Sequence, residues 1–300
     1  MHTKERFHLT VRLLCFGLLL AAIGFRLASI LPKQSVPRAS AAEPTIDYPA
    51  LLYEPPQEVA QLAFTESDAA FAPILNWSGE SVDAKELITA PLEFKLSDEP
   101  TVLIVHTHAT ESYCHMDGYR TNDTEQNVVR VGKAIADQLN QNGIPTIHDT
   151  TLIDREGYYD SYARAEQIIE GYLEKYPTIQ MVLDVHRDSA TDASGKEVAL
   201  TAQYKGEQAA QLMFVMGTGA SGQSHPNWRQ NLSFALKLQA LCEKEAPGIF
   251  RDLNLRSQRY NQHLTPHSVL VEVGSAGNTL SQALASAELL ADCLTRLLTS

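Results

Sequence analysis

The stretch Thr101-Val-Leu-Ile-Val-His106-Thr-His108-Ala-Thr-Glu111-Ser-Tyr113 joins an uninterrupted apolar run to a cluster of side chains that can bind a metal. Residues 102–105 are all Val, Leu or Ile, which predicts a buried strand of a parallel sheet. Ligands in open α/β sheets bind beyond the carboxyl ends of the strands. His106, His108 and Glu111 therefore lie where a site is expected, although either histidine can instead be a hydrogen-bonded structural residue.

The chain beyond this stretch alternates between helix and strand patterns. Val128, Val131, Ile135 and Leu139 have helical spacing, and Gly143 follows them as a stop signal. Further strands are predicted at 144–148, 179–186, 209–217 and 268–274, and further helices at 162–176, 231–244 and 280–298. Alternating elements with apolar strands predict an α/β fold, with a mostly parallel sheet and helices on both faces.

The N-terminal part of the chain has a different composition. Residues 1–10 form a predicted cytoplasmic tail, and residues 11–31 are apolar enough for a transmembrane anchor, provided that Arg26 extends its charge toward the interface. Residues 32–91 are rich in proline and are predicted to be an extracytoplasmic spacer, followed by a folded domain at 92–300. Cleavage after Ala39-Ser40-Ala41, which resembles a signal-peptidase site, is the alternative to the uncleaved anchor.

Composition excludes some classes of function. The 300 residues are 44% hydrophobic and carry a net charge of −12, which argues against a nucleic-acid-binding protein, since phosphates need a basic face. The four cysteines lack the spacing of a structural zinc site. A disulfide between two of Cys114, Cys242 and Cys293 stays open.

Two later strands add the remaining chemistry of the predicted site. His186 ends the strand at 179–186, and Glu272 lies in the strand at 268–274. Two histidines and one carboxylate can hold a tetrahedral zinc ion with an open position for water, and a further glutamate can act as general base. His186 could instead belong to a salt-bridged strand end, and Glu272 could be a structural carboxylate. Asp184 and Asp188 are plausible hydrogen-bond acceptors for a ligating imidazole or for Arg187.

A nucleophilic enzyme is the weaker interpretation. Ser112, Ser189 and Cys114 lie near these motifs, but no Gly-x-Ser-x-Gly elbow surrounds either serine. A Cys–His enzyme would leave the other strand-end groups without a role.

An ordered set of motifs over residues 92–296 resembles the stage II sporulation protein P family. These motifs are His-Thr-His-Ala-Thr-Glu-Ser-Tyr at 106–113, Asn-Val-Val-Arg-Val-Gly at 127–132, Asp-Val-His-Arg-Asp at 184–188, Met-Phe-Val-Met-Gly at 213–217, Asn-Trp at 227–228, Asn-Leu at 231–232, Arg-Tyr-Asn-Gln at 259–262, Val-Glu-Val-Gly at 271–274 and Asn-Thr at 278–279. Any one of them is weak, but the ordered set is highly specific.

The resemblance implies a membrane-anchored peptidoglycan hydrolase of endospore-forming bacteria that acts in engulfment of the forespore, with stage II sporulation proteins D and M as partners. It implies zinc-dependent N-acetylmuramoyl-L-alanine amidase activity and a catalytic domain similar to the wider zinc amidases. Endopeptidase activity is also associated with the family. The enzyme would be a single-pass protein of the cell membrane, with its catalytic domain between the mother-cell and forespore membranes.

Roles carried over from the zinc amidases fall on His108, Glu125 and His186 as metal ligands and on Glu272 as general base. The family signature includes Glu111, which makes it a rival of Glu125 as ligand and of Glu272 as catalytic group, and His106 is a rival of His108.

Three arginines are candidates for the stem-peptide carboxylates of the substrate. Arg187, Arg256 and Arg259 could each pair with a carboxylate through two hydrogen bonds, although a surface ion pair is an equal expectation for each. Two other classes of function stay open: a wall-binding module without hydrolysis, and a zinc endopeptidase or deacetylase of the cell wall.

Overall fold

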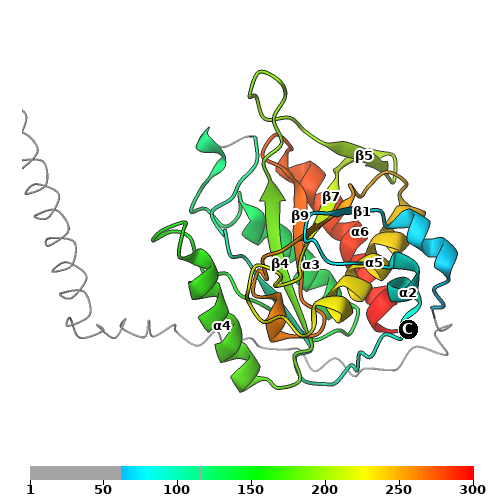
Figure 1. Ribbon diagram of the computed structural model, residues 1–300. Coiled ribbons are helices and arrows are strands. Elements are labelled where there is room, and N and C mark those ends of the chain that lie inside the picture. Colours follow the sequence, from blue (N-terminus) through cyan, green and yellow to red (C-terminus); the bar gives the residue numbers. More distant parts are fainter. Residues whose placement is uncertain (1–61, 115–116) are drawn as a thin grey trace, which may run out of the picture. The chain divides into compact units, whose positions relative to one another are not determined.

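The computed structural model describes residues 62–114 and 117–300, which form a seven-stranded sheet in the order β1-β8-β7-β9-β4-β2-β3 (Figure 1). Neighbouring strands run parallel except β7 and β9, which are antiparallel. The strands of this sheet are β1 Ile74–Asn76, β2 Val102–Val105, β3 Thr146–His148, β4 Met181–Asp188, β7 Leu212–Gly217, β8 Leu253–Arg256 and β9 Val269–Ser275. The predicted mostly parallel α/β sheet is therefore confirmed.

Helices cover both faces of the sheet, as predicted. The helices are α2 Ala84–Thr89, α3 Val128–Gln141, α4 Ser161–Lys175, α5 Trp228–Glu245 and α6 Leu280–Leu298, with short 3-10 turns η1 Glu66–Phe71, η2 Asp117–Tyr119 and η3 Gln262–Leu264. The larger apolar core packs α3, α5 and α6 against one face, and a smaller cluster packs α4 against the other (Figure 1). Alternate residues of β2 enter the two cores: Val102 and Ile104 the larger one, Leu103 and Val105 the smaller.

The helix after β2 begins and ends where its sequence signals indicate. Asn127 caps α3, because its side chain accepts a hydrogen bond of 2.9 Å from the Val129 amide. Gly143 follows the helix with φ of 76°, a left-handed conformation that glycine adopts without steric cost. The chain then enters β3 beside β2.

The strand predicted at 209–217 is two strands in the structure. Residues Glu207–Ala210 form β6, which pairs with β5 (Thr201–Tyr204) in a separate hairpin, whereas Leu212–Gly217 form β7 of the main sheet. The chain changes sheet at Gln211, whose amide donates to Leu200 (2.8 Å) and whose carbonyl accepts from Gly274 (2.9 Å). The sequence did not reveal this change, because Ala209 and Ala210 at the end of β6 are separated from the apolar residues of β7 by Gln211 alone.

The folded region also extends further toward the N-terminus than the boundary expected at residue 92. Within the predicted spacer, β1 pairs with β8 at the edge of the sheet, and α2 buries Leu87 and Ile88. Both elements are short, so their patterns in the sequence are weak. The prolines around them therefore led to the prediction of a spacer. Within residues 62–114 and 117–300, no helix is long and apolar enough to cross a membrane. The anchor predicted at 11–31 and the alternative cleavage site at 39–41 lie outside the described residues.

Candidate functional site

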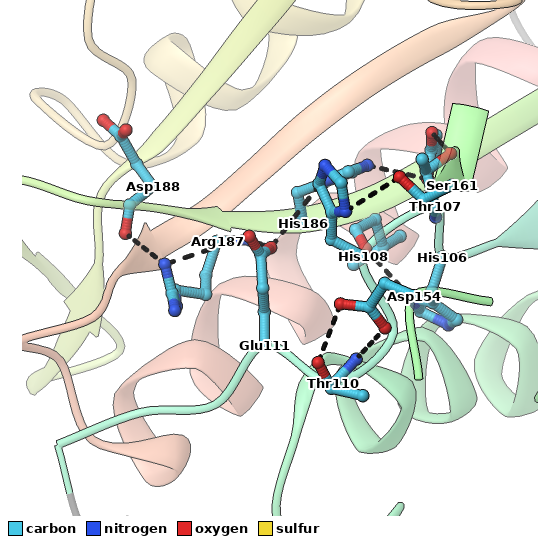
Figure 2. Close-up of polar contacts among 12 residues, drawn as sticks. His106, Thr107, His108, Thr110, Glu111, Asp154, Ser161, His186, Arg187 and Asp188 are labelled. Carbon is cyan, nitrogen blue, oxygen red and sulfur yellow. Dashed lines mark hydrogen bonds and ion pairs between the residues drawn. The ribbon is translucent and has the colours of Figure 1, made fainter. Parts of the chain in front are cut away.

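The strand-end residues converge because three neighbouring parallel strands end at one edge of the sheet. Val105 of β2 pairs with Asp184 of β4, and His186 of β4 pairs with Glu272 of β9. Side chains alternate between the faces of a strand, so Asp184, His186 and Glu272 share the face that α4 covers. Figure 2 shows His186 beside Glu111 at this edge.

Two buried carboxylates hold the backbone of the 106–111 stretch. Asp184 accepts hydrogen bonds from the amide (2.8 Å) and the hydroxyl (2.6 Å) of Thr107. Asp154 does the same for Thr110, at 2.9 and 2.7 Å (Figure 2). Hydrogen bonds to ionised acceptors are strong, and these four clamp the chain on both sides of His108.

His108 is buried and has a defined tautomer. The Ser161 hydroxyl donates to the Tyr158 carbonyl (2.7 Å), so its oxygen accepts from Nδ1 of His108 at 3.2 Å. Nδ1 therefore carries the proton and Nε2 keeps a free lone pair, the arrangement that a metal ligand requires. The ring stacks on Tyr158 at 4.1 Å, and burial followed by the charge of His186 lowers its pKa to about 4.

His186 lies between two carboxylates at 3% exposure. Its Nε2 lies 2.9 Å from Oδ1 of Asp184, although without the alignment of a hydrogen bond, and its Nδ1 lies 3.6 Å from Oε2 of Glu111. Burial alone would lower its pKa, but Asp184 and then Glu111 outweigh burial and raise the pKa well above 6.5. The surroundings of this ring therefore favour a positive charge.

Glu111 is one of the two carboxylates beside His186. It is 6% exposed, and burial would raise its pKa, but His186 and Arg187 lower the pKa below its usual value. Its Oε1 lies 3.7 Å from Nη2 of Arg120 and 3.9 Å from Nη1 of Arg187. Its Oε2 accepts from the Arg187 amide at 3.2 Å and faces His186. Glu111 is thus an ionised carboxylate with Oε1 near two guanidinium groups and Oε2 between the Arg187 amide and the His186 imidazole.

The pKa of Glu272 is shifted in the opposite direction from that of Glu111. Burial, helped by the charges of Glu111 and Asp188, raises its pKa to about 8, while His186 and Arg187 oppose this change. Its Oε2 is buried and has no hydrogen-bond partner among the described residues. A carboxyl group that exchanges its proton near neutral pH is suited to general acid–base chemistry.

The structure does not bring His106 and Glu125 into this group. The His106 side chain lies on the α3 face, where Nδ1 donates to the Val185 carbonyl at 2.9 Å and Nε2 lies 2.9 Å from Nε2 of His148. Glu125 is exposed, with its carboxylate 3.5 Å from Nε of Arg130.

The three arginines suggested as substrate contacts already have partners. Arg187 is 8% exposed and donates to the Ser112 and Tyr119 carbonyls, both at 2.9 Å. Arg259 pairs with Glu166 at 2.7 Å, and Arg256 contacts the Tyr260 side chain.

Several residues around the centre carried no signal in the sequence. Asp154, Ser161 and Tyr158 come from the loop before α4 and its first residue, and each acts on the 106–111 stretch. Their spacing matches no motif, because their partners are 44 to 53 residues away in the chain. Asp184 was predicted as an acceptor for an imidazole, and its nearest ring is that of His186, two residues away.

The centre offers two imidazoles and a carboxylate to a cation. As they stand, no three His, Cys, Asp or Glu side chains among the described residues are spaced to hold a metal ion. However, Oε2 of Glu272 is buried in this centre without a hydrogen-bond partner among the described residues, and Nδ1 of His186 faces Oε2 of Glu111 at 3.6 Å. Buried polar groups usually have partners, so an unpaired carboxylate oxygen beside these groups fits a missing ligand. The donor set of His108, His186 and Glu111 suits zinc.

Solved structures similar to this chain include two amidases. N-acetylmuramoyl-L-alanine amidase AmiC2 of Nostoc punctiforme is 14% identical, with a TM-score of 0.44 over 69% of this chain and 100% of that chain. The apo form of N-acetylmuramyl-L-alanine amidase Ami1 from Mycobacterium abscessus is 16% identical, with a TM-score of 0.37 over 66% of this chain and 98% of that one.

Sequence comparison gives a more specific result. Stage II sporulation protein P of Bacillus subtilis (strain 168) is 28% identical over 254 residues, which are 79% of this chain, and the chain spans 59% of that relative's length. The family model for stage II sporulation protein P matches residues 57–295, well over half of the chain and the whole of the sheet that carries the centre. The chain therefore belongs to the stage II sporulation protein P family.

Proposed function

We propose that this chain is a zinc-dependent peptidoglycan hydrolase of sporulation that cleaves the amide between N-acetylmuramic acid and L-alanine. One observation carries the proposal: His108, His186 and Glu111 meet at one buried edge of the sheet, directly beside a glutamate whose pKa is raised to about 8. Membership of the stage II sporulation protein P family supports the substrate and the process.

In this proposal, three groups would hold the zinc ion: Nε2 of His108, the imidazole of His186 and one oxygen of Glu111. A bound zinc ion polarises a carbonyl oxygen and makes a water molecule acidic near neutral pH. Ser161 keeps the proton on Nδ1 of His108, and Asp184 lies against the far side of the His186 ring. Arg120 and Arg187 lie near Oε1 of Glu111, while Oε2 accepts one hydrogen bond from the Arg187 amide and keeps a second lone pair for the metal.

Glu272 would move the proton. Its carboxylate accepts a proton from the attacking water and then delivers that proton to the leaving nitrogen of L-alanine. Burial raises the pKa of Glu272, which helps this carboxyl group to hold the proton between the two steps. Its place directly opposite His186 keeps the base next to the metal ligands.

Digestion of purified peptidoglycan tests this activity. The zinc-loaded protein should release intact stem peptides with a free L-alanine amine, identified by mass spectrometry, and a chelator should abolish their release until zinc is restored. Shortened cross-links would instead indicate an endopeptidase, and glycans that have lost acetyl groups a deacetylase. Binding to peptidoglycan with no soluble product would leave a binding module. Full activity after removal of all metal would contradict the proposed role of zinc.

We also propose that residues 11–31 anchor the chain in the membrane and that stage II sporulation proteins D and M are its partners. Protease added to protoplasts should then remove the folded domain, while the mature chain keeps an N-terminus at or next to Met1. An N-terminus at Ala42 would show cleavage instead. Co-purification of the full-length chain with proteins D and M from sporulating cells tests the partnership, with the chain lacking residues 1–31 as the comparison.

A further inference from the structure

A cavity of about 470 Å³ opens next to the candidate centre. Its lining includes Thr121, Asn122, Arg120, Asp154, Arg155 and Tyr158. Two of these residues also form the wall of the centre: Tyr158 stacks on the His108 ring, and Arg120 approaches Glu111 at 3.7 Å. A substrate group in this cavity would therefore lie one side chain away from the proposed metal ligands.

One of the two arginines in the cavity is already fully engaged. Arg120 donates to Asp154 at 2.6 Å and to the Thr110 hydroxyl at 2.9 Å, and its guanidinium lies 5.1 Å from the centre of the Tyr158 ring. Asp154 is in turn saturated by Arg120 and by the two bonds from Thr110. These charges neutralise one another and hold the wall in place.

Arg155, the second arginine of the cavity, differs from Arg120 in its contacts. Its side chain is exposed at the cavity and makes no hydrogen bond or ion pair with any part of the chain that the structure describes. The two arginines and Asp154 leave the cavity with a net charge of +1. A guanidinium without a partner, in a polar cavity of this size, is suited to bind a carboxylate through two parallel hydrogen bonds.

We propose that this cavity binds a carboxylate on the peptide arm of the substrate, with Arg155 as its direct contact. The proposal rests on the proposed function, and it replaces Arg187, Arg256 and Arg259 as the groups that recognise peptide carboxylates. Arg155 lies outside the centre, so it adds the same binding energy before and during the reaction. It is therefore a specificity-determining residue that selects peptides with a free carboxylate over their amidated forms.

A pair of synthetic substrates tests the proposal. The two muramoyl peptides differ only in that the carboxylate of the peptide arm is free in one and a carboxamide in the other. The zinc-loaded full chain should hydrolyse the free acid with a kcat/KM about 10- to 100-fold higher, the usual contribution of a charge-assisted hydrogen bond. The difference should appear in KM and leave kcat unchanged.

Variants locate the effect. Arg155→Gln should reduce the kcat/KM of the free acid to that of the amide, without changing hydrolysis of the amide. Arg155→Lys should retain part of the preference, because it keeps the charge and loses the two-pronged geometry. Arg296→Gln is the matched control: Arg296 is an exposed arginine on α6 that pairs with Glu245, so this variant loses one positive charge elsewhere. Arg296→Gln should hydrolyse the free acid and the amide with the same kcat/KM values as the unmodified chain.

Binding by calorimetry separates this proposal from the proposed function. If the chain hydrolyses neither substrate, tighter binding of the free acid that Arg155→Gln removes would still support the cavity and would reject only the hydrolase. Hydrolysis of both substrates at equal kcat/KM would overturn the cavity and leave the hydrolase standing. Tighter binding of inorganic phosphate than of the free acid, lost in Arg155→Gln, would also overturn it, since the anion would then not be a peptide carboxylate.

Discussion

Two histidines lie near the carboxyl ends of adjacent parallel strands and are almost equally buried, yet they have opposite properties. His106 follows β2 and turns toward α3, where its contacts are a backbone carbonyl and the ring of His148. His186 lies two residues before the end of β4 on the α4 face, between Asp184 and Glu111. Burial lowers the pKa of His106 to about 4, whereas the two carboxylates raise that of His186 well above 6.5. Carboxylates, rather than burial or position along the strand, therefore distinguish the face that carries the candidate site from the α3 face.

The largest difference between the two faces should appear on truncation of the histidines. His186→Ala should lose both bound zinc and hydrolysis, because the remaining two ligands hold the metal poorly. His106→Ala should keep its zinc, since its side chain faces α3. Elemental analysis and release of stem peptides measure the two quantities. A folded His106→Ala protein without zinc would reverse the assignment of the two faces.

The next largest effect separates the base from the ligands. Glu272→Gln keeps the size of the side chain and removes its basic oxygen, so zinc should stay while turnover falls by roughly 10²- to 10⁴-fold. Single-turnover kinetics and metal content on the same preparation provide the measurement. Loss of zinc in this variant would make Glu272 a ligand, and unchanged turnover would move the proton transfer to Glu111.

A smaller effect distinguishes Glu111 from Glu125, the two glutamates between β2 and α3. Glu111→Gln should weaken zinc binding by about 10- to 100-fold or more, because it removes the charge that faces His186. Glu125→Gln, its matched control, should have no effect, since Glu125 is exposed and its carboxylate lies beside Arg130. Competition with a zinc-binding dye gives both affinities. The converse result would make Glu125 the ligand and would require the loop at 121–126 to move on metal binding.

The smallest effect concerns the α3 face alone. A Cβ at Gly132 would overlap Cε1 and Nε2 of His106, so Gly132→Ala should cost about 1–3 kcal/mol of stability and leave the metal content unchanged. Gly171→Ala in α4 is the control: its Cβ would meet no atom within 4 Å, so it should stabilise the helix slightly. Thermal unfolding compares the two. Zinc loss in Gly132→Ala would show that the two faces are coupled.

Much of this edge could be predicted from the sequence, because its information is local. Apolar runs that end in histidine located β2 and β4, and Gly143 located the end of α3. The antiparallel entry of β7 beside β9 could not be read in the same way, because both strands are apolar and nothing local fixes strand direction. The choices between His106 and His108 and between Glu111 and Glu125 could not be made from the sequence either. Both His106 and His108 follow β2, and only the direction of each side chain separates them.

The contacts that support the centre were the least predictable. Thr107 and Thr110 are ordinary residues until each meets an aspartate, one on β4 and the other in the loop before α4. Ser161 matters because its single proton is already committed to the Tyr158 carbonyl. Such roles depend on distances across the fold, which spacing in the sequence does not contain.

The pairing of β4 with β9 has a consequence for the order in which the candidate site is assembled. Glu272 reaches His186 only after a strand more than 80 residues downstream inserts between β4 and β7. Contacts that are distant in the chain form late in folding, and synthesis adds them last. A nascent chain that ends before residue 269 already contains His108, His186 and Glu111, yet it lacks Glu272. The candidate site is therefore complete only when the last strand of the sheet in sequence order is in place.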